Sequence, residues 1–443
     1  MTEFSFIERD DQNLSFPRIL ASLYVRRHPL LADVRYNLAE PESMRMPTTF
    51  GMNQIVSHGF GMFLFAALLP FMREAIGFSP WQLAIIGALT QLAYLGGALL
   101  LGTLGHRIGT SRLALVTGIT SSGLLFLMSQ LRDPLTITLV LTCLAASAAI
   151  SWGCIVEIVS RCARAEDRAT YLSCASSGTA WGYAINGLLI LLVVPALGWQ
   201  TSWQLASLFG VLVVCLTWHL LKHLKTLPTT CTDSHEAMIA PRRLLAIVLG
   251  ERTALIACLI CLLVGFTTMP FSYWLNTYLD ELGLPATLGG YTWAMVGGSG
   301  MIAGLVIGKL ADRKGHGAAL ALIFGGFAMG LWAFAHDPGR WALFAGFGYG
   351  LMYFPMWGIV AGWVNCRYSS TATMQISGIC MVAFGLGGAL GNLLAGYVRE
   401  NIGSLQGVFF GLAGASLLLV LLALIILRGD KASVTPPTAA GAC

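Results

Sequence analysis

The stretch Gly308-Lys-Leu-Ala-Asp-Arg-Lys-Gly315 has a second copy 206 residues earlier in the chain, Gly102-Thr-Leu-Gly-His-Arg-Ile-Gly109. Further matches lie in nearly the same register: Gly59-Phe60 with Gly265-Phe266, Gly77 with Gly283 and, at an offset of 205, Trp152-Gly153 with Trp357-Gly358. In a chain with 51 glycines, chance supplies scattered matches but not readily an ordered set on one register. We therefore expect two duplicated halves of the same topology.

The composition places this chain in lipid. Of its 443 residues, 56% are hydrophobic and 11% are charged, whereas a soluble domain carries about 25% charged residues. So little charge cannot cover a water-facing surface of this size, which excludes a soluble enzyme, a disordered tail protein and a nucleic-acid binder. The 11 cysteines lie mostly inside apolar runs, and Cys258 and Cys261 have no second pair or His at metal spacing. We predict no disulfide framework, no metal site and no cofactor.

From about residue 50 onward, apolar runs of about 20 residues alternate with short breaks, and each run is long enough to cross about 30 Å of hydrocarbon. The twelve predicted spans are about 51–72, 81–103, 112–131, 135–158, 170–196, 202–222, 252–277, 286–309, 316–335, 340–362, 371–397 and 405–427. The predicted fold is an all-α membrane protein with twelve transmembrane helices in two six-helix halves.

The longest break, 223–250, is polar and divides the spans six and six. The predicted organisation is a cytoplasmic N-terminal segment 1–48, an N-terminal half 49–222, a central loop 223–250, a C-terminal half 251–428 and a cytoplasmic tail 429–443. Residues 16–38 mix apolar side chains with Arg and fit a short helix on the bilayer surface. A loosely ordered tail, or a true start at Met44, Met46 or Met52, explains this segment equally well.

The distribution of positive charge predicts the orientation. Of the 26 Lys and Arg, 22 fall on one side of the predicted helices, and Arg73, Arg132, Arg340 and Arg399 fall on the other. Cytoplasmic loops carry such an excess, so we expect a multi-pass integral membrane protein of a bacterial inner membrane with both termini in the cytoplasm. The same count leaves no Lys or Arg in the interior of any predicted span.

The stretch 308–315 and its copy at 102–109 resemble the loop motif of the major facilitator superfamily, G-x-L-a-D-R-x-G-r, which recurs after the second and eighth helices. The resemblance covers about residues 50–428 in helix count, halves, long central loop and both loop copies. It implies a transporter in which this loop latches the cytoplasmic helix ends in the outward-facing state. The residues that match the motif, and so form the expected gating loop, are Gly102, Arg107, Gly109, Gly308, Asp312, Arg313 and Gly315.

The residue types suit such a latch. The first glycine lets the helix approach a neighbour closely, the last permits a tight turn, and the cations lie at the headgroup level. The first copy lacks the acidic residue of the motif, so a latch there relies on Arg107, with Glu157 as its candidate partner. The alternative is that these cations are ordinary anchors at the cytoplasmic surface.

Two ionisable residues fall inside predicted spans and are candidates for proton coupling, His58 and Glu157. Embedded ionisable groups are expensive and usually functional, and a histidine changes charge near neutral pH. The alternatives are a hydrogen-bonded structural histidine and an interfacial glutamate of the latch. Protons are therefore the expected coupling ion, while a uniporter stays open.

Polar and aromatic side chains gather in the helices that line the cavity of this superfamily, namely the first, second, fourth, fifth, seventh, eighth, tenth and eleventh. They include Asn53, Gln54, Ser57, Gln91, Tyr94, Trp181, Tyr183, Asn186, Tyr273, Trp274, Asn276, Trp293, Tyr349, Tyr353, Trp357, Gln375 and Asn392. For any one Trp or Tyr, the aromatic belt at the membrane surface is the competing explanation. The candidates for substrate binding are those near the middle of their spans: Gln91, Tyr94, Trp181, Asn186, Tyr353 and Trp357.

The absence of Lys and Arg from the predicted spans argues against multiply anionic solutes, which need cationic side chains to replace lost hydration. We predict a secondary active transporter that moves a small neutral, zwitterionic or moderately hydrophobic organic solute by alternating access, as a proton-coupled monomer in the lipid bilayer. An enzyme is not expected, because there is no HExxH, GxSxG or nucleotide-binding loop. An exporter of a toxic or secreted metabolite, or a membrane sensor with the same fold, remains the alternative.

Overall fold

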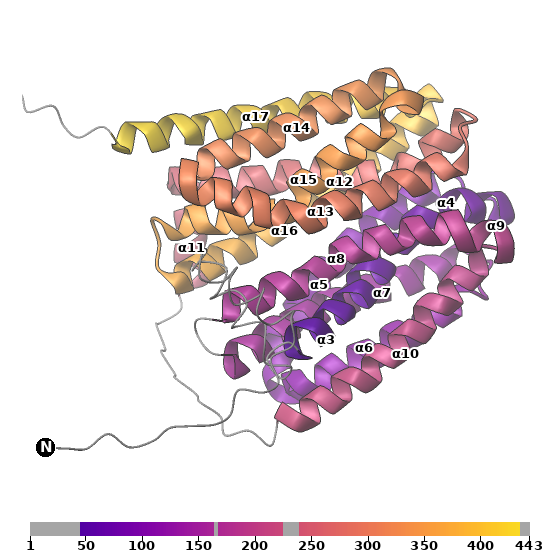
Figure 1. The fold of residues 1–443 in the computed structure, drawn as a ribbon, viewed down its shortest axis with the longest axis horizontal. Coiled ribbons are helices and arrows are strands. Elements are labelled where there is room, and N and C mark those ends of the chain that lie inside the picture. Colours follow the sequence, from indigo (N-terminus) through magenta and orange to yellow (C-terminus); the bar gives the residue numbers. More distant parts are fainter. Residues whose placement is uncertain (1–44, 164–166, 225–238, 435–443) are drawn as a thin grey trace, which may run out of the picture.

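The computed structural model describes residues 45–163, 167–224 and 239–434, apart from the side chains of 102–107, 169, 241, 305, 370–371 and 430–434. Within these ranges the chain consists of helices joined by short turns and contains no strand. The helices run nearly parallel to one another in two bundles, one from each half of the sequence (Figure 1). The segment 16–38, expected on the bilayer surface, lies outside the described residues.

The N-terminal half contains six spans, two of them interrupted by π-helical turns. They are α3 (Arg45–Gln54) with η1 (Ile55–Phe60) and α4 (Gly61–Ile76); α5 (Pro80–Ile108); α6 (Thr110–Met128); α7 (Pro134–Cys162); α8 (Arg168–Leu188) with η2 (Leu189–Val193) and α9 (Val194–Leu197); and α10 (Trp199–Leu224).

The C-terminal half follows a short helix, α11 (Pro241–Gly250), that the sequence did not predict in the central loop. Its spans are α12 (Arg252–Glu281), α13 (Ala286–Lys314), α14 (His316–His336), α15 (Pro338–Asn365), α16 (Ser370–Ile402) and α17 (Gln406–Val434). Eleven helices of the described chain are long and apolar enough to cross a membrane, or twelve when α13, bent by 41° between Gly304 and Val306, counts as one span. The predicted helix count is confirmed, although α17 continues into the predicted tail.

Glycine turns repeat between the halves. The described glycines with positive φ form three pairs, Gly77 with Gly283, Gly109 with Gly315 and Gly198 with Gly403. Their spacings of 206, 206 and 205 residues reproduce the register seen in the sequence. A side chain would strain the backbone at such φ values, so glycine is the residue that ends these helices cheaply.

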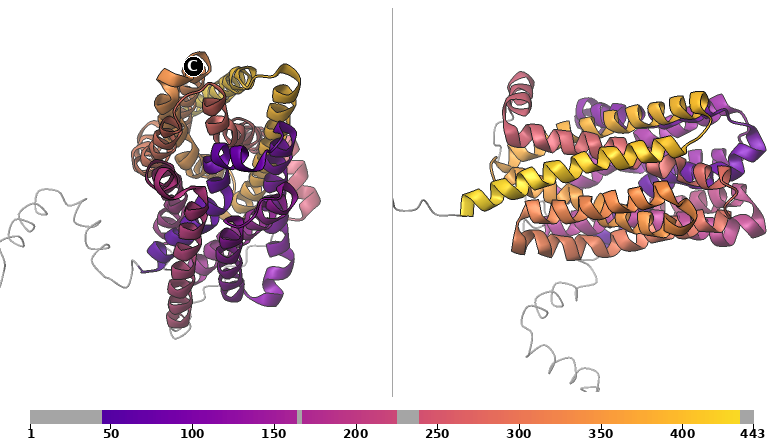
Figure 2. Two further views of the ribbon diagram at one scale, coloured as in Figure 1. Left: turned by 90° about the vertical axis from the view of Figure 1, so that its right-hand side faces the viewer. Right: turned by 90° about the horizontal axis from the view of Figure 1, so that it is seen from above.

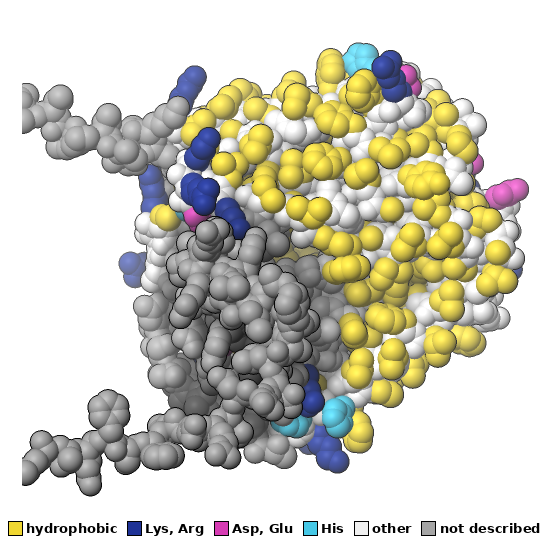
Figure 3. All heavy atoms as spheres, in the orientation of Figure 1, with side chains coloured by type: hydrophobic (Ala, Val, Ile, Leu, Met, Phe, Trp, Pro, Cys, Tyr) yellow, Lys and Arg dark blue, Asp and Glu magenta, His cyan; other side chains and the backbone are white. Residues whose placement is uncertain are grey.

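Both ends of the described chain lie on the same side of the bundle (Figures 1 and 2). We call this side the terminal end and the other side, where Gly77 and Gly283 turn the chain, the far end. Apolar side chains cover the flank between the two ends, while Lys and Arg gather mainly at the terminal end (Figure 3). This pattern is that of a multi-pass integral membrane protein.

Small residues bring helices of the same half together. A Cβ atom on Gly178 or Gly182 of α8 would collide with the backbone of Gly51 or Gly59 in the first span. In the other half, Gly387 of α16 meets the backbone of α12 in the same way. Small-residue faces thus let the helices of one half pack closely.

The seam between the halves is closed toward the far end and open toward the terminal end. Along α13, Gly290 packs against Gly187 of α8, and Gly297 packs against Ala184. Gly304 lies seven residues further along the same stripe, two helical turns closer to the terminal end, but it is exposed and has no atom within 4 Å of a Cβ position. The two helices therefore touch near the far end and separate beyond Gly297.

The second helix pair at the seam behaves in the same way. Gly87 of α5 packs against Asn392 of α16, and Gly385 of α16 faces the backbone of Gln91. Gly378, seven residues nearer the terminal end on the stripe of Gly385, is exposed with open space around it. Two independent helix pairs thus describe one V-shaped seam.

Candidate functional site

The π-helical turn η1 presents His58 toward α5. The His58 ring stands edge-on to Tyr94, with ring centroids 5.6 Å apart, and its Nε2 lies 3.1 Å from the Tyr94 hydroxyl. Its Nδ1 lies 3.1 Å from the Ser57 hydroxyl. π-helical turns inside α-helices are frequent at functional sites, because they turn a side chain away from its regular position.

The hydrogen bonds of Ser57 fix the tautomer of neutral His58. The Ser57 hydroxyl donates to the carbonyl of Asn53 at 2.8 Å, which uses its one proton. Toward His58 it therefore acts as an acceptor, so Nδ1 carries the proton and Nε2 accepts from the Tyr94 hydroxyl. The unprotonated nitrogen of neutral His58 is thus hydrogen-bonded to a tyrosine of the next span.

The C-terminal half supplies an aromatic wall opposite this pair. Phe384 of α16 lies between Trp357 and Tyr353 of α15, with ring centroids 5.2 and 6.2 Å away. The two groups meet at the seam through Gln91, one turn from Tyr94, which packs against Gly388 and faces Gly385 of α16.

We call the six residues His58, Tyr94, Gln91, Tyr353, Trp357 and Phe384 the central site. Three belong to each half, and none carries a carboxylate, an ammonium or a guanidinium group. The central site therefore offers hydroxyl, imidazole, amide and indole groups between aromatic faces.

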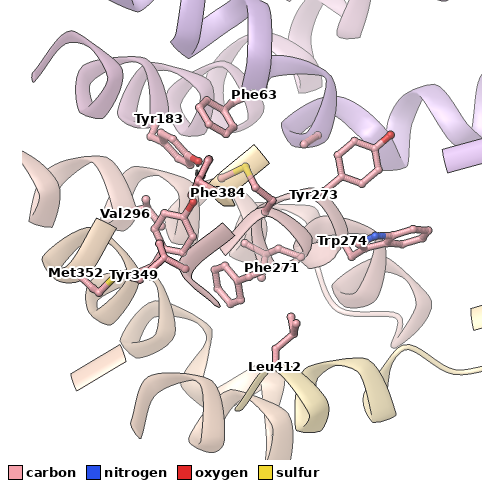
Figure 4. Close-up of a cluster of buried hydrophobic side chains, with 14 of the residues drawn as sticks. Phe63, Tyr183, Phe271, Tyr273, Trp274, Val296, Tyr349, Met352, Phe384 and Leu412 are labelled. Carbon is pink, nitrogen blue, oxygen red and sulfur yellow. Dashed lines mark hydrogen bonds between the residues drawn. The ribbon is translucent and has the colours of Figure 1, made fainter. Parts of the chain in front are cut away.

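On the far-end side, the central site rests on a hydrogen-bonded tyrosine pair. Tyr183 of α8 and Tyr349 of α15 point toward one another, with their hydroxyls 3.0 Å apart (Figure 4). The Tyr349 hydroxyl also lies 3.0 Å from Ser272 of α12, and Ser272 donates to the carbonyl of Thr268 at 2.7 Å. Each hydroxyl has one proton, so the direction of the chain is fixed: Tyr183 donates to Tyr349, and Tyr349 donates to Ser272.

A second polar chain crosses the seam further toward the far end. Trp293 stacks on Tyr183 with ring centroids 4.8 Å apart and donates to the Asn276 side chain at 3.2 Å. Asn276 in turn donates to the backbone carbonyl of Ala67 in α4 at 2.7 Å. All three side chains are buried, so these contacts join the halves in the interior of the protein.

Ion pairs complete the closure at the far end. Glu281 of α12 accepts from Arg73 of α4 at 3.2 Å and from Arg399 of α16 at 2.8 Å. Arg73 belongs to the opposite half, so this carboxylate joins the halves directly. We call the tyrosine chain, the Trp293–Asn276 chain and the Glu281 pairs together the far seal.

A pocket of about 310 Å³ opens beside the far seal. Its lining comes from α4, α12 and the start of α13, and it includes Arg73, Asn276 and Asp280. The pocket reaches Asn276 from the far end. The small space around Tyr183 and Tyr349, in contrast, has no room for a water molecule.

The family profile described as Major Facilitator Superfamily matches residues 54–374, which is more than half of the chain. The chain belongs to the major facilitator superfamily. Among curated proteins, none matches the sequence significantly.

Solved structures of superfamily transporters share the fold. A crystal structure of a mutant of the nucleoside transporter NupG superposes with a TM-score of 0.67 at 16% identity, covering 86% of this chain and 99% of that one. A D-xylose-proton symporter gives a TM-score of 0.67 at 14% identity, covering 86% and 96%. At these identities the likeness concerns the fold alone.

The structure brings together five of the predicted coupling and binding residues: His58, Gln91, Tyr94, Tyr353 and Trp357. Trp181 lies elsewhere. It is 51% exposed and shares an outer stripe of α8 with exposed Leu188, whereas Tyr183, two residues further on, points into the protein.

Asn186 is fully buried between two spans. It donates to the carbonyl of Gly59 at the end of η1 at 2.8 Å, while its own carbonyl oxygen has no partner. Glu157 is near the terminal end and forms an ion pair with Arg161 one turn away. The expected pairing of Glu157 with Arg107 lies outside the described side chains, because those of residues 102–107 are not described. Gly102 belongs to the same stretch.

The second gating loop is not engaged. Asp312 and Arg313 are exposed and form no ion pair within the described part of the chain, and Gly315 makes the expected turn with a φ of +87°. A Cβ atom placed on Gly308 would meet no atom of another helix within 4 Å. The expected close helix approach at Gly308 is therefore wrong for this conformation, because the seam is open there.

The far seal contains residues that the sequence analysis did not select. Tyr183, Tyr349, Trp293 and Asn276 stood among the polar and aromatic residues of cavity-lining helices, but nothing in one sequence ranked them above Trp181. Glu281 was placed in a break between spans. The one available signal is topological rather than local, since the predicted break that contains Glu281 lies on the same side of the membrane as the rare cations Arg73 and Arg399.

Replacing Glu281 with Gln should open the far seal. The variant loses the charge that holds Arg73 and Arg399 together, and loss of a contribution of about 1.4 kcal/mol changes an equilibrium tenfold. We expect about a tenfold faster deuterium exchange in far-end peptides of α4, α12 and α16, measured by mass spectrometry. Glu400→Gln is the control, since Glu400 is exposed and forms no ion pair in the described chain. Equal exchange in both variants would contradict a sealing role for Glu281.

Proposed function

We propose that this superfamily member carries a small neutral, zwitterionic or moderately hydrophobic organic solute by exposing the central site to one side of the membrane at a time. The observation that carries the proposal is the asymmetric seam. Hydrogen bonds and ion pairs close it at the far end, and the helix pairs separate toward the terminal end. A transporter that works by alternating access must close the seam at one end while it opens the seam at the other end.

The chemistry of the central site supports the solute class. Aromatic faces contact flat or apolar parts of a molecule, while hydroxyl, amide and indole groups supply directional hydrogen bonds. No cation is present among its six residues to replace the hydration of a multiply charged anion.

We further propose that the terminal end faces the cytoplasm of a bacterial cell and that the chain works as a monomer. The excess of Lys and Arg at that end supports this orientation. In this orientation the structure is the inward-open state. An exposed, unlatched gating loop agrees with the role that the superfamily resemblance implies, since the loop latches in the outward-facing state.

Protons are the proposed coupling ion, with His58 as the acceptor. In the neutral state Tyr94 donates to Nε2 of His58, so the Tyr94 proton is occupied. When Nε2 takes up a proton it becomes a donor, and the Tyr94 hydroxyl must turn to accept from it. The Tyr94 proton is then free to donate to a solute in the central site. Proton uptake and solute binding would thus favour one another, which is the requirement for symport.

Proteoliposomes with an imposed pH gradient test this function. The panel contains uridine and D-xylose, chosen because structural neighbours carry a nucleoside or D-xylose, together with L-leucine and citrate. We expect at least one of the uncharged or zwitterionic solutes to accumulate and citrate to stay out. Solute-induced thermal stabilisation without flux of any panel member would favour a sensor and contradict the proposal.

His58→Gln should uncouple transport. Glutamine keeps a polar side chain at this position but does not titrate, so a gradient of one pH unit should no longer drive the about tenfold accumulation expected for one proton per solute. Exchange of labelled for unlabelled solute should persist. The matched control is His336→Gln, because His336 is exposed at the far end and bonds to the carbonyl of Trp332. Gradient-driven accumulation that survives in His58→Gln would exclude this histidine as the coupling group.

Trp357→Leu should weaken solute binding from the central site. We expect the half-saturation concentration of the accumulated panel solute to rise up to about tenfold, since an aromatic stacking contact contributes about 0.5–1.5 kcal/mol and 1.4 kcal/mol corresponds to a factor of ten. Trp181→Leu removes a tryptophan of the outer surface and should leave the value within twofold. If the two substitutions act alike, the central site is misassigned.

A further inference from the structure

Two buried polar atoms at the seam have no hydrogen-bond partner. The hydroxyl of Tyr273 on α12 and the side-chain oxygen of Asn392 on α16 are both without one, although their residues are only 8% and 1% exposed. A buried polar group without a partner costs free energy, and native proteins retain few of them. Both atoms lie where the halves meet in the closed part of the seam.

Tyr273 faces the N-terminal half. Its ring lies 6.0 Å from Phe65 of α4, and it extends away from Tyr183 and Tyr349 in the close-up of the buried cluster (Figure 4). The Tyr273 ring therefore packs against the opposite half.

Asn392 also depends on the opposite half for its surroundings. Its amide donates a long bond of 3.4 Å to the carbonyl of Gly87 on α5, and its oxygen is unused. Asn392 stands 206 residues after Asn186, the register of the internal repeat, and the oxygen of Asn186 is unpartnered as well. Both halves thus carry, at matching positions of the repeat, an asparagine whose side-chain oxygen accepts no hydrogen bond.

We propose that Tyr273 and Asn392 line the cavity of the alternate state, in which the seam opens at the far end, and that they bind solute hydroxyl or amide groups there. The proposal rests on the alternating access argued above. In that state the phenol supplies a donor and the amide oxygen an acceptor, a pair suited to an uncharged polar solute. In the present state both groups are covered and unsatisfied, which weakens the closed seam and keeps it able to open.

The far-end pocket gives this cavity an entrance. The pocket already reaches Asn276, and Tyr273 lies three residues earlier on the same helix, almost one turn deeper. The bonds of Asn276 to Ala67 and of Glu281 to Arg73 separate the pocket from the groups below. Breaking these bonds would extend the pocket inward along α12.

Thiol labelling from the far-end side tests the proposal without any solute. Full-length Tyr273→Cys and Asn392→Cys proteins, reconstituted in vesicles, are treated with a membrane-impermeant methanethiosulfonate, and peptide mass spectrometry reads the label at each position. Ser202→Cys is the matched control. Ser202 is equally buried and its hydroxyl equally unpartnered, but α10 packs within its own half.

If distance from the far end alone set the labelling rate, the control would react faster. Ser202 lies three residues from the far end of α10, whereas Tyr273 lies eight residues from the far end of α12. We nevertheless expect positions 273 and 392 to react at least ten times faster than position 202. Adding Glu281→Gln should accelerate labelling at 273 and 392 several-fold and leave 202 unchanged. Two positions are used so that a folding defect in one variant leaves the other informative.

Labelling at 273 and 392 no faster than at 202, with no response to Glu281→Gln, would overturn the proposal. The outcome is separate from the transport assay. Seam labelling in a protein that accumulates no panel solute would contradict the proposed transport function and leave the alternate cavity in place.

Discussion

The hydrogen bond between Tyr183 and Tyr349 is the contact on which the rest of the structure depends. It joins the two halves at the floor of the central site, and its direction is fixed by the hydroxyl chain that continues to Ser272. A bond between neutral hydroxyls contributes only about 0.5–1.5 kcal/mol net. It can therefore specify the closed geometry in a dry interface and still be broken in each cycle.

The remaining features follow from a closure that must be reversible. Small residues such as Gly187 and Gly297 let backbones of opposite halves approach without interlocking side chains, so the halves can separate as rigid bodies. The charged residues of the far seal lie at its outer edge. Glu281 and its two arginines are partly exposed there and avoid the full cost of desolvation. None of the six residues of the central site carries a permanent charge, and His58 is the one imidazole among them.

Sequence reasoning recovered the features that the bilayer and the backbone impose. Span length follows from hydrocarbon thickness, and turn glycines such as Gly109 and Gly315 follow from positive φ, so both could be predicted. The sequence does not predict which aromatic side chains face inward. Lipid and protein interior are both apolar, so hydrophobic periodicity does not set the rotation of a helix about its axis. Trp181 and Tyr183 illustrate this, since two residues of offset separate the outer surface from the floor of the site. The Glu281 pairs arise from tertiary packing of three helices and have no local signature.

Distance distributions at both ends of the seam test the central claim, that the closure moves from one end to the other. Spin labels at Leu197 and Ile402 report the far end, and labels at Ser160 and Asp312 report the terminal end, all at exposed positions on opposite halves. In lipid nanodiscs, double electron–electron resonance at pH 5 and pH 8 should show two populations at each end. The account predicts that they shift in opposite directions when the pH changes. A single far-end distance that stays the same while the terminal end opens and closes would contradict it.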